Sequence, residues 1–315
     1  MTHWKLILAY DGTPFHGWQV QPGLATVQGL LSDAIHRAIG ERVLPQGSGR
    51  TDTGVHALAQ VASFPLQAPI PADRLQIALN RCLPAAIRIL SAQTVAPDFH
   101  ARYSALRKTY EYRIFPSRAP IQAEAHGPDG QPDEWETNIC PPTLAPFVWP
   151  CPWPISLDRL NRAADHVLGT HDFTSFAASD PDLVARAPAQ PEGAGSPAKG
   201  PVLPAQIPGD PVPADQDQLG SGEAGPKSAV RTITQSAWHA EGGLLIYRVT
   251  ATGFLHHMVR NLVGTFVQCG ANRLSPQSIP QIMAARSRSA AGPTAPATGL
   301  FLLSVEYPAA SPSTL

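Results

Sequence analysis

Residues 47–64 read GSGRTDTGVHALAQVASF, a polar run bounded by glycines that passes directly into an apolar strand. Glycines on both sides of a short polar run let the backbone turn tightly and approach a ligand closely. The run places the guanidinium of Arg50 and the carboxylate of Asp52 two residues apart. It is not a Walker loop, because GxxxxGK[ST] is absent, and the GxGxxG pattern fails at its third glycine. Asp52 therefore either serves a functional site or caps a turn.

The segments on either side of this run alternate between strand and helix periodicity. Strands are predicted at 4–9, 57–64, 86–95, 106–115 and 300–307, with a hairpin formed by 230–239 and 243–252 around a turn at Glu241 and Gly242. Helices are predicted at 27–39 after the cap residue Thr26, and at 72–80, 256–269 and 275–286. Mixed strands and helices with a hairpin indicate an α+β fold. We expect two pseudo-symmetric α+β halves, 1–104 and 105–308, with a cleft between them.

Proline and charge are unevenly distributed along the 315 residues. Ten of the 34 prolines fall in residues 116–154 and ten in 181–226. We therefore predict a loop insertion at 117–143, a flexible Pro/Gly/Ala-rich insertion at 181–228 that contains no Phe, Trp or Tyr, and a tail at 309–315.

The net charge of −1 conceals a basic body. Without residues 116–154 and 181–229, 13 acidic and 19 basic residues remain. Five basic residues are clustered within 17 positions, at Arg102, Arg107, Lys108 and Arg113 of this body and at Arg118, which lies at the start of the first proline-rich stretch. Such a cluster is either a solvated face or a surface for a phosphate backbone.

Several classes of protein are disfavoured by composition. No run of 18 apolar residues exists, and the apolar stretch near the N-terminus is too short for a signal peptide, so we expect a cytoplasmic protein without a membrane span. The four cysteines are far apart and lack CxxC spacing, which indicates neither a zinc site nor a disulfide framework.

Two further segments combine polar and aromatic residues. Residues 98–104 read DFHARYS, and the strand that follows displays Tyr110 and Tyr112 on one face. Residues 254–261 read FLHHMVRN, which we expect to open a helix with His257 and Arg260 on the same side. A metal site at the His pair is disfavoured, because neighbouring helical residues point about 100° apart and no third ligand is nearby in sequence.

GRTDTGVH, DFHARYSA, YDGTPFHGWQ and FLHHMVRN, in this spacing, resemble the tRNA pseudouridine synthase A family. HDFTSF at 171–176 and the closing GLFLLSVEY are also similar. The resemblance implies the pseudouridine synthase fold, with a mixed, mainly antiparallel sheet, and a cytoplasmic homodimer that binds tRNA. It implies isomerisation of uridine to pseudouridine in the anticodon stem-loop, at tRNA positions 38, 39 and 40, without a cofactor or metal.

The same resemblance implies roles for individual residues. Asp52 matches the catalytic aspartate, Arg260 the arginine paired with it, Tyr110 the tyrosine that packs on the target base, and Arg50 an arginine that holds the target nucleotide extruded. We name Arg102, Arg107, Lys108 and His257 as possible tRNA contacts. Judged by its residue type alone, Tyr110 would be a strand residue that packs on the sheet.

The chain departs from the family pattern at Thr53, where alanine is most frequent, and in its long insertions. Two other functions remain as alternatives. A catalytically silent RNA-binding protein of the same fold is disfavoured because Asp52, Tyr110 and Arg260 are all present. A glycosidase would need two carboxylates at a defined separation, and the 47–56 run supplies one.

Overall fold

A computed structural model describes residues 1–117, 139–178 and 228–309. The predicted insertions at 117–143 and 181–228 and the tail at 309–315 therefore lie outside the described residues except at their ends, as does Arg118. None of the helices within these ranges is long and apolar enough to cross a membrane.

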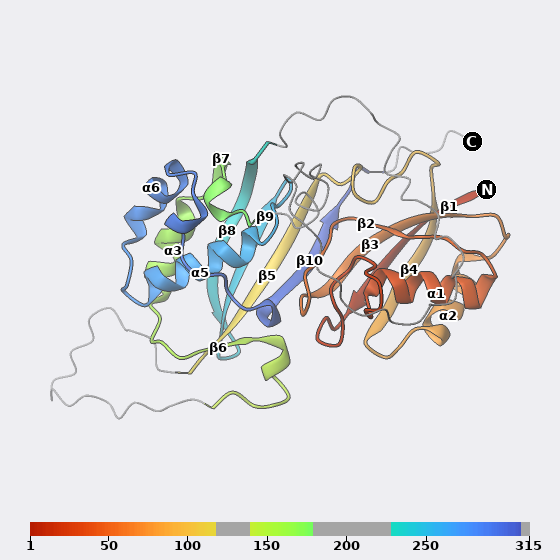
Figure 1. Ribbon diagram of the computed structural model, residues 1–315, viewed down its shortest axis with the longest axis horizontal. Coiled ribbons are helices and arrows are strands. Elements are labelled where there is room, and N and C mark those ends of the chain that lie inside the picture. Colours follow the sequence, from red (N-terminus) through yellow and green to blue (C-terminus); the bar gives the residue numbers. More distant parts are fainter. Residues whose placement is uncertain (118–138, 179–227, 310–315) are drawn as a thin grey trace, which may run out of the picture. The chain divides into compact units, whose positions relative to one another are not determined.

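One mixed sheet runs through the described residues and takes strands from both predicted halves (Figure 1). Its order is β4-β1-β3-β10-β5-β9-β8-β7, with β2 paired to β3 and β6 paired to β5. The bounds are β1 Thr2–Tyr10, β2 Gln46–Gly47, β3 His56–Leu66, β4 Ile87–Val95, β5 Arg107–Pro116, β6 Trp149–Cys151, β7 Gly169–Asp172, β8 Val230–Glu241, β9 Leu244–Ala251 and β10 Leu300–Glu306. All pairs are antiparallel except β10 with β3 and β6 with β5. The predicted α+β class is confirmed.

The helices pack against this sheet at its two ends. Their bounds are α1 Val27–Ile39, α2 Ala72–Cys82, α3 Leu157–Asp165, α5 Met258–Gly270 and α6 Ile279–Ala284. Helix α1 begins where predicted, because the Thr26 side chain accepts a hydrogen bond from the Gly29 backbone N–H. Helices α1 and α2 lie beside β1–β4, and α3 and α5 lie beside β8 and β9 (Figure 1).

Three predicted details differ from the structure. The hairpin turn is Gly242-Gly243 rather than Glu241-Gly242, because both glycines adopt the positive φ of a type I′ turn. The helix predicted from residue 256 begins at Met258, because His257 is left-handed, with φ 58°. The helix predicted at 275–286 is a 3₁₀ turn followed by the short α6, since prolines interrupt it. Four elements in different parts of the fold were not predicted: β2, β6, β7 and α3.

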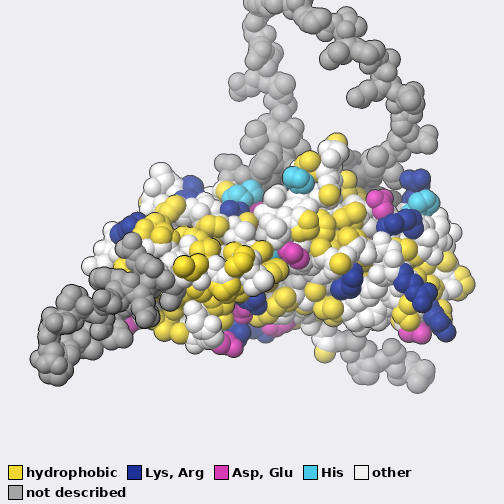
Figure 2. All heavy atoms as spheres, turned by 90° about the horizontal axis from the view of Figure 1, so that it is seen from below, with side chains coloured by type: hydrophobic (Ala, Val, Ile, Leu, Met, Phe, Trp, Pro, Cys, Tyr) yellow, Lys and Arg dark blue, Asp and Glu magenta, His cyan; other side chains and the backbone are white. Residues whose placement is uncertain are grey.

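A continuous core lies between the sheet and its helices. Trp4, Leu6 and Leu8 fill its β1 side, and on the other side Tyr112 and Tyr247 of the sheet are buried with Phe266 of α5. Eleven of the 13 residues of α5 are buried, so this helix is part of the core. On the face in Figure 2, Lys and Arg side chains lie between hydrophobic patches, many of them toward the end that carries β1, β3 and β4.

Candidate active site

The turn that carries Asp52 connects β2 to β3 and is packed against a second glycine-containing segment. The Val55 N–H donates to the Asp52 carbonyl over 3.1 Å, which closes the turn. A Cβ on Gly12 would lie 2.0 Å from the Val55 carbonyl oxygen, and one on Gly17 would lie 2.5 Å from that of Thr51. Only glycine allows this approach, so the YDGTPFHGWQ and GRTDTGVH motifs are two sides of one backbone contact.

Buried polar side chains hold the turn from the sheet side. Tyr10 and Thr51 share a hydrogen bond of 2.8 Å between their hydroxyls. The fully buried Gln60 donates to the Gly49 carbonyl over 2.9 Å and accepts from the Ser48 hydroxyl over 2.6 Å. Because the backbone polar groups of the turn are satisfied by fixed partners, the position of Asp52 is set by the sheet.

The Lys108 ammonium bonds to the Ser48 carbonyl in the same turn. Burial, with a smaller contribution from the positive charge of Arg102, lowers the pKa of Lys108 to about 8. The sequence-based prediction placed Lys108 among possible tRNA contacts. The structure places its ammonium against the backbone of the Asp52 turn.

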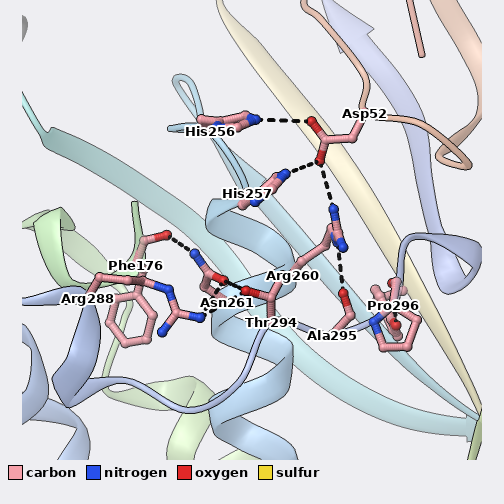
Figure 3. Close-up of polar contacts among 11 residues, drawn as sticks. Asp52, Phe176, His256, His257, Arg260, Asn261, Arg288, Thr294, Ala295 and Pro296 are labelled. Carbon is pink, nitrogen blue, oxygen red and sulfur yellow. Dashed lines mark hydrogen bonds and ion pairs between the residues drawn. The ribbon is translucent and has the colours of Figure 1, made fainter. Parts of the chain in front are cut away.

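Three nitrogen atoms from the start of α5 surround the Asp52 carboxylate (Figure 3). The side chains of His257 and Arg260 each lie 3.1 Å from Oδ2, through Nε2 and Nη1 respectively. His256 Nε2 lies 3.5 Å from Oδ1. The predicted approach of Arg260 to Asp52 is therefore present, although the two residues are 208 positions apart.

Opposing effects act on the pKa of Asp52, whose side chain is 24% exposed. Burial raises that pKa, because a carboxylate loses solvation in the protein. The hydrogen bond and charge of His257, followed by the charges of Arg260 and His256, outweigh burial, so the pKa lies below its usual value. Asp52 is therefore an anion at neutral pH.

The two histidines depart from the predicted helical geometry. Both residues precede α5, so their side chains do not point about 100° apart as they would on a helix. Instead the two rings lie side by side, with centroids 3.9 Å apart and planes tilted by 30°. A third potential ligand, far from the His pair in sequence, lies near it in space: Asp52, His256 and His257 could each offer one ligand atom to a metal ion. The guanidinium of Arg260 on the same carboxylate opposes a further cation there by charge repulsion.

Tyr110 lies on β5 and is 8% exposed. Its ring meets that of Phe254 edge to face, with centroids 5.0 Å apart. Burial, and then the negative potential of Tyr10 and Asp52, raises the pKa of Tyr110, so its hydroxyl stays protonated at neutral pH.

Comparison of the sequence with known proteins identifies the family of this chain. The profile of a family described as tRNA pseudouridine synthase matches residues 6–104 and 215–308, more than half of the chain. The chain belongs to this family. Relatives named tRNA pseudouridine synthase A are 41% identical in Solibacter usitatus and 40% identical in Moorella thermoacetica, covering 96% of this chain and 98% of each relative. One from Rhodopseudomonas palustris is 37% identical, covering 98% of this chain and all of the relative. The resemblance drawn from the four motifs is confirmed.

The other residues named from the resemblance to the tRNA pseudouridine synthase family occupy different surroundings. Arg50 is exposed in the Asp52 turn. Arg102 is exposed beside the Tyr103 ring, 5.7 Å from its centroid, whereas Arg107 pairs with Glu306 at 3.1 Å. Arg113, from the predicted basic cluster, pairs with the buried Glu111. GRTDTGVH, YDGTPFHGWQ and FLHHMVRN thus meet at the Asp52 turn, while the basic cluster is divided between surface and ion pairs.

Proposed function

We propose that this protein is an isomerase that converts uridine to pseudouridine in the anticodon stem-loop of tRNA, at positions 38, 39 and 40, with Asp52 as its catalytic group. The observation that carries the proposal is the Asp52 carboxylate lying 3.1 Å from both His257 and Arg260 at the start of a core helix, which lowers the pKa of Asp52. Membership of the tRNA pseudouridine synthase family supplies the reaction class, and resemblance to the family supplies the tRNA positions.

The reaction needs a group that is anionic before it acts, although burial favours its protonated form. The bond from ribose C1′ to uracil N1 breaks, a bond from C1′ to C5 forms, one proton leaves C5 and one is gained at N1. No electrons are exchanged with a cofactor. An ionised Asp52 can attack as a nucleophile or accept a proton, and His257 and Arg260 together favour its charged form against the cost of desolvation.

The target uridine must leave its stack before Asp52 can reach it. Flipping a base costs a few kcal/mol. Stacking of the uracil on the Tyr110 ring returns about 1–3 kcal/mol. Arg50, exposed in the same turn as Asp52, is positioned to hold the extruded nucleotide. Tyr110 and Arg50 therefore bind the flipped base and Asp52 acts on it.

The remaining affinity for tRNA comes from contacts to its phosphates. The basic body, with exposed Arg102 near the start of β5, supplies positive charge for this purpose. We further infer from the family resemblance that the enzyme acts as a cytoplasmic homodimer in which two subunits hold one tRNA.

The test uses unmodified tRNA transcripts that carry a single uridine at position 38, 39 or 40, with cytidine at the other two. Pseudouridine is mapped by carbodiimide labelling and primer extension after incubation with the purified protein. We expect modification in each of the three transcripts and none when all three positions are cytidine. Modification outside 38–40, or of none of these transcripts, would overturn the proposed specificity.

A further inference from the structure

Arg260 is held by the loop of residues 291–296, hereafter the 291–296 loop, as well as by Asp52. Its Nε donates to the Ala295 carbonyl over 2.8 Å, and the Ala295 N–H donates back to the Arg260 carbonyl over 3.1 Å. With Nε fixed on a carbonyl, the planar guanidinium can present Nη1 in one direction, toward Asp52. The position of Ala295 therefore sets the direction of the catalytic ion pair.

A cluster of polar side chains around Asn261, the residue after Arg260 in α5, holds this loop (Figure 3). Asn261 is fully buried, and its Oδ1 accepts from the Thr294 hydroxyl over 2.7 Å and from Arg288 Nη2 over 3.0 Å. Arg288 Nη2 also donates to the Thr294 hydroxyl over 2.9 Å. The Asn261 amide donates to the Phe176 carbonyl over 2.7 Å, which fixes its orientation. The Thr294 hydroxyl thus joins the 291–296 loop to α5 directly beside the Arg260–Ala295 contact, because Thr294 precedes Ala295 and Asn261 follows Arg260.

The same loop approaches the helix backbone too closely for a side chain. A Cβ on Gly264 would lie 1.7 Å from the Pro293 carbonyl oxygen. The Gly292 N–H donates to the Thr265 hydroxyl over 2.9 Å, and Tyr112 donates to the Pro296 carbonyl over 2.7 Å. Both ends of the loop are anchored, so the Thr294 hydroxyl acts within a fixed frame.

We propose that Asn261, Arg288 and Thr294 are positioning residues that direct the Arg260 guanidinium onto Asp52. This rests on the proposed function of the Asp52 site. Asp52 itself touches none of the three, so their effect on catalysis passes through Ala295 and Arg260. Loss of the Thr294 hydroxyl frees Ala295 to shift, the Arg260 bond to Asp52 lengthens, and the carboxylate is protonated at a higher pH.

The test compares Thr294→Val, which removes the hydroxyl at nearly constant volume, with Thr294→Ser, which retains it. Thr294 is exposed, so neither change disturbs the core. We expect kcat of Thr294→Val to fall about two- to ten-fold, the range of one lost hydrogen bond, while KM for tRNA is unchanged and the acid limb of the pH profile moves to higher pH. Thr294→Ser is expected to restore wild-type values.

A double-mutant cycle separates positioning from general stabilisation of the loop. In an Arg260→Lys background, which lacks Nε, Thr294→Val should cause no further fall in kcat. An equal fall in both backgrounds would overturn the inference, as would unchanged kcat and an unmoved acid limb in Thr294→Val alone. Arg288→Lys, which loses the Nη2 group that donates to both Asn261 and Thr294, gives a second arm should Thr294→Val fail to fold.

These outcomes are distinguishable from failure of the proposed function. A wild-type protein that forms no pseudouridine in tRNA would contradict the function itself. A wild-type protein that is active and depends on Asp52, together with a fully active Thr294→Val, would contradict only the positioning role.

Discussion

Replacing Asp52 by asparagine should lower stability in a pH-dependent way. The amide keeps the shape of the side chain and removes its charge. In the folded protein, Asp52 accepts bonds of 3.1 Å from His257 and from Arg260, and the Arg260 side chain is only 16% exposed. The substitution therefore leaves a mostly buried guanidinium without its anionic partner.

The size of this effect follows from two charge-assisted bonds weighed against desolvation. Hydrogen bonds to charged groups contribute about 1.5–3 kcal/mol and neutral ones about 1 kcal/mol, so two bonds lose about 1–4 kcal/mol. Relief of the burial cost of the carboxylate offsets part of this, since burial is the largest single influence on its pKa. We expect a net loss of about 1–2 kcal/mol, which for a domain of this size lowers Tm by roughly 2–8 °C.

The sign of the pH dependence follows from the lowered pKa of Asp52. The unfolded carboxyl binds protons more readily than the folded one, so the contribution of Asp52 to stability is complete above the ordinary aspartate pKa of about 3.9 and is lost as pH falls through the lowered folded pKa. The difference in Tm between wild type and Asp52→Asn should therefore have its largest value at pH 7 and at pH 5, and should decrease below about pH 4.

The assay is thermal unfolding between pH 3 and pH 8. A matched control is Asp158→Asn, because Asp158 forms an exposed i,i+4 pair with Arg162 that contributes about 0.5 kcal/mol or less. An Asp52→Asn protein as stable as wild type at pH 7, or a difference in Tm that is constant with pH, would refute the reasoning.

Three further predictions concern the same site. Arg260→Lys keeps the charge and loses the planar fork, so turnover should fall at least ten-fold with tRNA affinity unchanged in a filter-binding assay, and wild-type turnover would show that the fork is dispensable. His257→Ala removes a hydrogen bond that lowers the pKa of Asp52, so the acid limb of the pH profile of kcat/KM should move to higher pH, and an unmoved limb would contradict this. Arg102→Ala should weaken tRNA binding and reduce the slope of log affinity against log salt by about 0.7–0.9 if it contacts one phosphate, whereas Arg162→Ala, an exposed control on α3, should leave the slope unchanged.

The sequence was sufficient to predict those helices and strands whose caps and hydrophobic periodicity lie within the element itself. The apolar stripe of 27–39 with Thr26 before it predicted α1 exactly where it lies, because the cap and the periodicity agree. Helix α3 was missed, since it is only nine residues long and follows a proline-rich stretch. The edge strands β6 and β7 were missed because three or four residues carry too little periodicity.

Of the contacts around Asp52, only the one with Arg260 was predicted, and that prediction came from the family resemblance. Asp52 and Arg260 were paired from it, and no local pattern joins residues 208 positions apart. The contact of His257 with Asp52 was not predicted, because it depends on a left-handed residue before α5 that a helical pattern does not reveal. The hydrogen bond from the Lys108 ammonium to the Ser48 carbonyl was likewise not predicted, because it depends on the tertiary contact between β5 and the Asp52 turn.

The most direct test of Asp52 as the catalytic group compares purified wild-type protein with Asp52→Ala on one tRNA transcript. Pseudouridine, free uracil and bound tRNA are measured in the same reactions. We predict that wild type forms pseudouridine without releasing uracil, and that Asp52→Ala binds tRNA within a few-fold of wild type and forms pseudouridine at less than about one per cent of its rate, since loss of an essential group costs orders of magnitude. Turnover above that level in Asp52→Ala, or uracil released in place of pseudouridine by wild type, would contradict the assignment.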